Sequence, residues 1–147
     1  MIVWVAMLLL AQGAGEISDS PEERTLCEDA RTQMEMNTCA VREYDAADEA
    51  LNGQWGETLA LMRRLDGDGD IGDGQPGYVE TLRAAQHAWL TYRDEHCRLS
   101  SYDARGGSLQ PLLASDCMTS LTEARTAELS RLLSNQVSGE PKPVSEE

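Results

Sequence analysis

The sequence predicts an all-α fold, an antiparallel three-helix bundle with a short N-terminal helix, stapled by two disulfides. Apolar residues recur at steps of three or four along three long segments, and no segment shows sustained alternation with a period of two. The chain has 147 residues, of which 41% are hydrophobic, enough for one domain with its own core. Short connections between long helices predict the antiparallel arrangement.

An apolar leader opens the chain and is predicted to be a signal peptide covering residues 1–13. Met1 to Ala11 carries no charged side chain, and Ala11 and Gly13 suit the small-residue positions of a cleavage site. The apolar run is too short to anchor a mature protein across a bilayer, and no cysteine stands there for lipid attachment. We therefore expect a periplasmic or secreted protein with no membrane span in its mature form.

Four cysteines follow the leader: Cys27, Cys39, Cys97 and Cys117. An even number in an exported chain favours two disulfides over zinc, since no pair has the spacing of two to four residues typical of zinc ligands. His96 also projects away from its neighbour on a helix. We favour pairing Cys27 with Cys39 and Cys97 with Cys117, although four cysteines permit three pairings.

Capping signals mark where the first helices begin. Ser20-Pro21-Glu22-Glu23 starts a short helix that is predicted to run to about Ala30. Thr32 and Glu35 have the spacing of a capping box and start the first long helix, which ends before Gly67. Its apolar stripe consists of Tyr44, Ala47, Leu51, Trp55, Leu59, Met62 and Leu65.

Two further long helices complete the predicted domain, residues 20–135. The second runs from Tyr78 to about Tyr102, and Gly106-Gly107 ends it. The third runs from about Pro111 to about Asn135, and residues 136–147, rich in Gly, Pro and Glu, are predicted to be a disordered tail. The predicted stripes are Leu82, Ala85, Trp89, Tyr92 and Cys97 on the second helix, and Leu113, Cys117, Leu121, Ala124, Glu128 and Leu132 on the third.

The composition restricts the function. A net charge of -14 disfavours binding to nucleic acid or anionic lipid and favours a basic or neutral protein partner, although an acidic surface also simply keeps an exported protein soluble. The cysteines are assigned to disulfides, and the only histidines, His87 and His96, project to opposite faces of one helix. We therefore predict no enzyme, no catalytic residues, no cofactor and no metal.

An acidic connection between the first two long helices resembles the start of a calcium-binding EF-hand loop. Its aspartates are Asp66, Asp68, Asp70 and Asp73. The match fails at the sixth position, where Ile71 replaces the required glycine, and at the twelfth, where Gly77 replaces the bidentate glutamate. Weak calcium binding remains a hypothesis, and the four aspartates are also a candidate contact loop for a partner.

Several polar residues lie within or beside the apolar stripes. They are Asp48 and Asn52 on the first long helix, Gln86, Trp89, Arg93 and Asp94 on the second, and Arg125 on the third. Their helical spacing predicts a charge-assisted network between helices. We favour a structural role that fixes helix register over direct ligand binding.

The order of these residues resembles the LprI-like lysozyme inhibitor family. The resemblance rests on Cys27, Thr32 to Asn37, Cys39, Tyr44, Asp48, Leu51-Asn52, Leu82 to Leu90, Tyr92 to Asp94, Cys97, Gly106 to Ser108, Cys117 and Leu121 to Arg125. It implies a periplasmic or secreted helical protein of a family named for a lysozyme inhibitor. Our first hypothesis is therefore a binding protein whose acidic surface attracts a cationic lysozyme and which inhibits it by occluding the enzyme. The alternative is an envelope structural or assembly module that binds a protein or a peptidoglycan component. The chain departs from the family in lacking a lipid-attachment cysteine and in its connection from Asp66 to Gly77.

Overall fold

A computed structural model describes residues 27–69 and 72–138, with side chains described as far as residue 135. Three long helices, α2 (Gln33–Gly67), α3 (Tyr78–Ser100) and α4 (Gln110–Ser138), make up most of this part, and a 3-10 turn, η1 (Ser101–Ala104), follows α3. The described residues contain no strand, which confirms the all-helical class. The predicted signal peptide lies outside the described residues, as does the predicted short helix except for its last few residues, of which Cys27 and Glu28 are helical. The predicted tail was placed too early, since α4 continues to Ser138, and residues 139–147 lie outside the described part.

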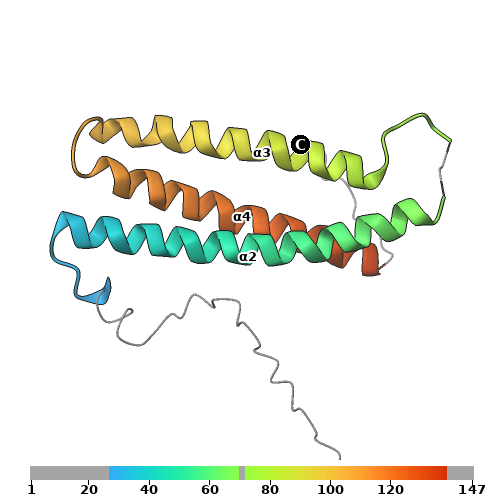
Figure 1. The fold of residues 1–147 in the computed structure, drawn as a ribbon, viewed down its shortest axis with the longest axis horizontal. Helices are drawn as coiled ribbons and strands as arrows, with labels where there is room; N and C mark the ends of the chain where they lie inside the picture. The colour runs from blue at the N-terminus through green and yellow to red at the C-terminus, as the bar shows by residue number, and fades with distance from the viewer. Residues whose placement is uncertain (1–26, 70–71, 139–147) are drawn as a thin grey trace, which may run out of the picture.

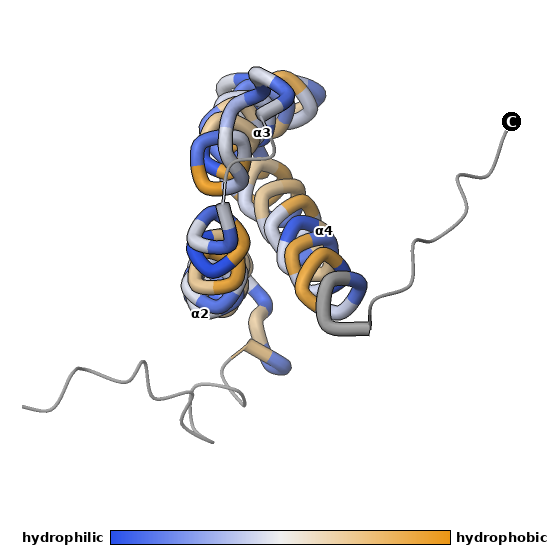
Figure 2. Tube along the Cα trace, turned by 90° about the vertical axis from the view of Figure 1, so that its right-hand side faces the viewer, coloured by the Kyte–Doolittle hydropathy of each residue, from blue (hydrophilic) through white to orange (hydrophobic). Residues whose placement is uncertain are grey.

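The three helices pack against one another as a bundle. Figure 1 shows the chain running forward along α2, back along α3 and forward again along α4. In the end-on view of Figure 2 the three helices occupy the corners of a triangle, with α4 inclined to the other two. The contact between α2 and α4 is the most extensive of the three. None of the described helices is both long and apolar enough to cross a bilayer.

The predicted capping box starts α2. The backbone N–H of Glu35 donates to Thr32 Oγ1 over 3.2 Å, and Glu35 Oε2 accepts from the N–H groups of Thr32 and Arg31 over 2.9 Å each. These hydrogen bonds, that from the Thr32 N–H first, lower the pKa of Glu35 below its ordinary value of 4.5. Donors that have no partner inside the helix are thereby satisfied.

The N-terminus of α3 is capped by a side chain from another helix. Its N-cap residue is Gly77, which has no side chain to offer, and the Asp66 carboxylate supplies the acceptors from the end of α2. Asp66 Oδ1 accepts from the Tyr78 N–H over 2.7 Å and Oδ2 accepts from the Val79 N–H over 3.0 Å. A Cβ on residue 77 would lie 2.9 Å from Asp66 Oδ1, so glycine leaves room for this carboxylate.

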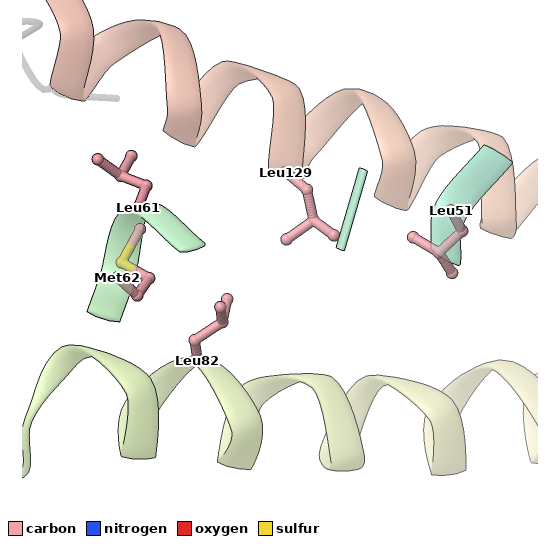
Figure 3. Packing of buried hydrophobic residues seen from close by; sticks show 5 residues of the cluster. All are labelled: Leu51, Leu61, Met62, Leu82 and Leu129. Carbon is pink, nitrogen blue, oxygen red and sulfur yellow. The ribbon is translucent and has the colours of Figure 1, made fainter. Parts of the chain in front are cut away.

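The apolar core lies between the three helices. Leu51, Leu61 and Met62 of α2, Leu82 of α3 and Leu129 of α4 form its buried centre (Figure 3). Partly buried hydrophobic residues surround it: Trp55, Leu59, Leu65, Val79, Trp89 and Leu133. Burial of leucine and methionine side chains of this size is worth about 1.5–3 kcal/mol each.

The predicted stripe of α4 is wrong beyond Leu121. Ala124, Glu128 and Leu132 are exposed, whereas Thr122 and Leu129 are fully buried. The buried face therefore lies about one residue later in phase, roughly 100° around the helix. On α3, Ala85 and Tyr92 are likewise exposed, and Gln86 and Arg93 take the buried positions. In both helices polar side chains occupy inward positions that a stripe of apolar residues cannot identify.

Both predicted disulfides are confirmed. Cys27 pairs with Cys39 with their Cα atoms 5.6 Å apart, and Cys97 pairs with Cys117 at 5.4 Å. The first links the segment before α2 to the first turns of α2, and the second links α3 to α4 around the Gly106-Gly107 corner. Under the chain-entropy account, each closes a loop worth about 2–4 kcal/mol.

Candidate functional site

Gln86 and Arg93 lie on the face that α3 turns toward the other helices. With Arg125 of α4 and the side chains that these three contact, they form what we call the polar seam. Leu82, Gln86, Trp89, Arg93 and Cys97 follow one another at steps of three or four on this face. Gln86 is only 8% exposed and Arg93 only 6%. A buried guanidinium is costly unless its donors are paired, so the surroundings of these side chains decide what the seam does.

Arg93 joins all three helices. Its Nε donates to Asp94 Oδ1 over 2.9 Å, and its Nη1 reaches Asp48 Oδ1 of α2 at 3.5 Å and Thr122 Oγ1 of α4 at 3.4 Å. The guanidinium carbon lies 5.4 Å from the ring centre of Tyr44 and 5.1 Å from that of Trp89. The cation is therefore held by carboxylates at the edge of the seam and by aromatic faces within it.

Arg125 of α4 is the second cation of the seam, three residues after Thr122. Its Nε donates to Gln86 Oε1 over 3.0 Å, and its Nη1 donates to Glu128 Oε2 over 2.9 Å. Its guanidinium carbon lies 5.8 Å from the ring centre of Trp89. Two cations from different helices thus meet the same indole ring.

The structure brings the predicted polar set together. Asn52 Nδ2 donates to Asp48 Oδ2 over 3.0 Å, which extends the network along the surface of α2. Sequence reasoning missed Thr122 and Glu128 as partners, and Tyr44 was assigned only to the apolar stripe. Burial raises the pKa of Tyr44, and this outweighs the opposing effect of Arg93.

The seam has no spare buried polar atom. Among the described residues, every buried side-chain nitrogen and oxygen has a hydrogen-bond partner. A binding or catalytic site usually offers unpaired polar groups toward its ligand. The buried polar atoms of the seam are instead satisfied by partners on α2, α3 and α4.

The four aspartates of the acidic connection differ in their hydrogen bonds and exposure. Asp66 caps α3, and Asp73 Oδ1 accepts from the N–H of Gln75 over 2.9 Å. Asp68 is exposed, and Asp70 lies outside the described residues. No group of three or more His, Cys, Asp or Glu side chains that could hold a metal ion occurs within the described ranges.

A groove with a volume of about 790 Å³ opens where this connection meets the three helices. Its walls come from Met62 and Asp66 of α2, from Tyr78, Thr81, Leu82 and Ala85 of α3, from Arg125 and Leu132 of α4, and from the connection itself, including Asp73. A groove of this size with mostly apolar walls and a few polar groups is the usual form of a binding site. Sequence reasoning identified the acidic connection but not the groove beneath it.

Comparison with known proteins places this architecture in a described family. Residues 27–129 match the family model described as "Lysozyme inhibitor LprI". An uncharacterised protein of Rhizobium meliloti, R02472, is 42% identical over 127 residues, which cover 86% of this chain and 90% of that protein. The uncharacterised protein YecT of Escherichia coli K12 is 29% identical over 115 residues, covering 75% of this chain and 69% of that protein. No solved structure matches significantly.

Proposed function

The chain belongs to the lysozyme inhibitor LprI family, and from this premise we propose that it is an exported binding protein that inhibits a lysozyme by occluding the enzyme. The single observation that carries the proposal is the family match, which begins at Cys27 and ends at Leu129. It therefore covers both disulfides and the whole polar seam, so the likeness extends to the elements that hold the fold together.

The charge distribution supports a cationic partner. The chain carries 26 acidic residues against 12 Lys and Arg, and two of those arginines, Arg93 and Arg125, are held in the seam beside carboxylates. The acidic side chains of the surface are therefore opposed by few exposed cations. Such a surface raises the rate at which a cationic enzyme is encountered, while local fit determines specificity.

The disulfides support export. Disulfides form and persist in oxidising compartments and are rare in cytosolic proteins. In the described residues all four cysteines are paired and none is free. Together with the predicted leader at residues 1–13, the paired cysteines support a location in the periplasm or outside the cell.

Inhibition is tested by the clearing of a cell-wall suspension by a c-type lysozyme. Purified protein lacking residues 1–13 is added at increasing concentration, and we expect the rate at which turbidity falls to decrease in a saturable manner. A reduced and alkylated sample of the same protein is the control for a folded inhibitor. No inhibition at micromolar concentration would reject lysozyme inhibition and favour an envelope structural or assembly module.

Export is tested on the protein purified from its native host. We expect the mature N-terminus to lie after residue 13, and we expect alkylation under denaturing conditions without reductant to label no thiol. Alkylation after reduction is the positive control, since it must label all four cysteines. Four free thiols on a protein that retains Met1 would reject the proposed location.

A further inference from the structure

The groove lies where α3 and α4 move apart. The disulfide between Cys97 and Cys117 holds the C-terminal end of α3 close to the first turns of α4. From there the inclination of α4 carries it away from α3, as the end-on view shows (Figure 2). Toward the start of α3, Ala85 of α3 and Leu132 of α4 do not pack together but line a common space of about 790 Å³.

The walls of this groove expose apolar surface. Met62 and Leu82 line the groove and belong to the buried core, and Ala85 and Leu132 line it and are exposed. Leu132 is 41% exposed although it lies one turn from the fully buried Leu129. An open apolar groove that continues into the core is suited to a side chain inserted from outside.

The charges around the groove are acidic on balance. Its one lining cation among the described residues, Arg125, is already paired with Glu128 at 2.9 Å. Asp66 and Asp73 also line the groove, and neither carboxylate has an ion-pair partner within the described part of the chain. The groove therefore complements an apolar group that carries positive charge beside it.

This complementarity selects among the possible occupants. The chain's own last nine residues, Gly139 to Glu147, contain three Glu and one Lys, so their charge has the same sign as that of the rim. A second copy of the chain, with a net charge of -14, has the same disadvantage. A cationic protein has the opposite sign and fits the rim.

We propose that this groove is the docking surface for the cationic partner: it receives an apolar side chain of that protein while flanking Lys or Arg side chains meet Asp66 and Asp73. The proposal rests on the proposed function and deepens it by naming the surface that binds the enzyme. Asp66 and Asp73 then form one rim of a groove that α3 and α4 complete.

The proposal is tested in the full mature chain by a substitution that fills the groove. Ala85→Trp places an indole on an exposed wall position, and Ala127→Trp is the matched control, since Ala127 is exposed on α4 and does not line the groove. We expect Ala85→Trp to weaken lysozyme inhibition about tenfold or more and Ala127→Trp to leave it within about twofold. Asp73→Asn should weaken it about threefold, and Asp103→Asn, at the other end of the bundle, should not.

A second readout separates this proposal from the proposed function. The same variants are titrated with a fluorescein-labelled peptide of leucines and lysines at helical spacing, and binding is followed by anisotropy. If peptide binding is lost only in Ala85→Trp, the groove is supported, even where neither the parent chain nor any variant inhibits lysozyme. That absence of inhibition would reject the proposed function alone. Inhibition that is equal in the parent chain, Ala85→Trp and Ala127→Trp would overturn the groove and leave the proposed function in place.

Two further outcomes would also overturn the groove as a partner site. Equal losses in Ala85→Trp and Ala127→Trp would show a general effect of added indole. A dimer of the parent chain that Ala85→Trp converts to a monomer, measured by light scattering, would assign the groove to a second copy.

Discussion

Asp66 links two helices through one carboxylate. It lies one residue before the end of α2, and its two oxygens accept the N–H groups of Tyr78 and Val79 at the start of α3. A negative charge at a helix N-terminus is favourable both as a hydrogen-bond acceptor and against the helix dipole. The residue therefore fixes how the connection returns the chain into α3.

Replacing Asp66 tests this role. Asp66→Ala is expected to lower the free energy of unfolding by about 1 kcal/mol, because two donors of α3 lose their acceptor. Urea denaturation measures the loss, and Asp68→Ala, on the exposed neighbour aspartate, is expected to stay within about 0.5 kcal/mol. Equal effects of the two substitutions would contradict the capping role.

Arg93 is the residue on which the seam depends most. Arg93→Ala removes the contacts to Asp48, Asp94 and Thr122 together, and we expect a loss of about 2–4 kcal/mol. The matched control is Arg98→Ala on the same helix, whose pair with Glu95 is exposed and is worth at most about 0.5 kcal/mol. Chemical denaturation of both variants measures the difference, and a loss below about 1 kcal/mol for Arg93→Ala would count against the seam.

Glu35 makes the start of α2 sensitive to acid. Hydrogen bonds from the Thr32 and Arg31 backbone lower the pKa of this carboxyl, so the folded chain binds its proton more weakly than the unfolded chain. Its contribution to stability is therefore complete above the ordinary pKa of 4.5 and is lost as the pH falls through the lowered value.

Glu35→Gln keeps a hydrogen-bond acceptor in the capping box but does not titrate. We expect the parent chain to have the higher denaturation midpoint at neutral pH and to lose that advantage as the pH falls below the ordinary pKa of 4.5 and through the lowered value. The variant itself provides the baseline for all other acid-sensitive groups. A difference between the two chains that stays constant with pH would show that the carboxylate charge is not what stabilises this cap.

At the scale of elements, the register of α4 distinguishes the predicted from the observed packing. Leucines at positions 129 and 132 are nearly one turn apart, yet one is fully buried and the other is 41% exposed. The difference arises because Thr122 and Arg125 occupy inward positions on α4, which turns the buried face about one residue from the apolar stripe.

The pair of leucines supplies its own matched control. Leu129→Ala is expected to destabilise the fold by about 2–5 kcal/mol through the cavity it leaves, and Leu132→Ala by less than about 1 kcal/mol. Thermal or urea denaturation of the two variants decides between the registers. A larger loss for Leu132→Ala would restore the stripe predicted from the sequence.

At the scale of the whole molecule, charge and shape act on different steps of binding. The net charge of -14 acts over distances longer than any contact and raises the encounter rate with a cationic protein. In the proposed complex, the groove between α3 and α4 acts only at contact and governs the dissociation rate.

Salt separates these two contributions. Raising NaCl from about 0.1 M to about 1 M shortens the screening length from about 10 Å to about 3 Å. We expect the association rate constant with a c-type lysozyme to fall about tenfold or more and the dissociation rate constant to change much less. Surface plasmon resonance measures both, and the urea midpoint at each salt concentration controls for the fold. An association rate that does not depend on salt would contradict electrostatic attraction.

The sequence alone determined the helical class and the boundaries of the long helices to within a few residues, and it favoured the disulfide pairing that the structure has. Each depends on groups close together in the chain: the Thr32 capping box, the turn-by-turn recurrence of apolar residues, and cysteines on either side of a corner. Helical spacing also identified Gln86, Arg93 and Arg125 of the seam, but not their partners Thr122 and Glu128.

Only the tertiary structure decided which faces are buried and where the groove opens. Arg93 contacts Asp48, 45 positions before it, and Thr122, 29 positions after it. These contacts, with that of Arg125 to Gln86, go with a register of α4 in which Thr122 and Arg125 point toward the other helices. Sequence patterns rank side chains by hydrophobicity, whereas burial of a paired guanidinium depends on partners that other helices supply. The role of Asp66 was hidden for the same reason, because its acceptors meet donors 12 and 13 residues later across a turn.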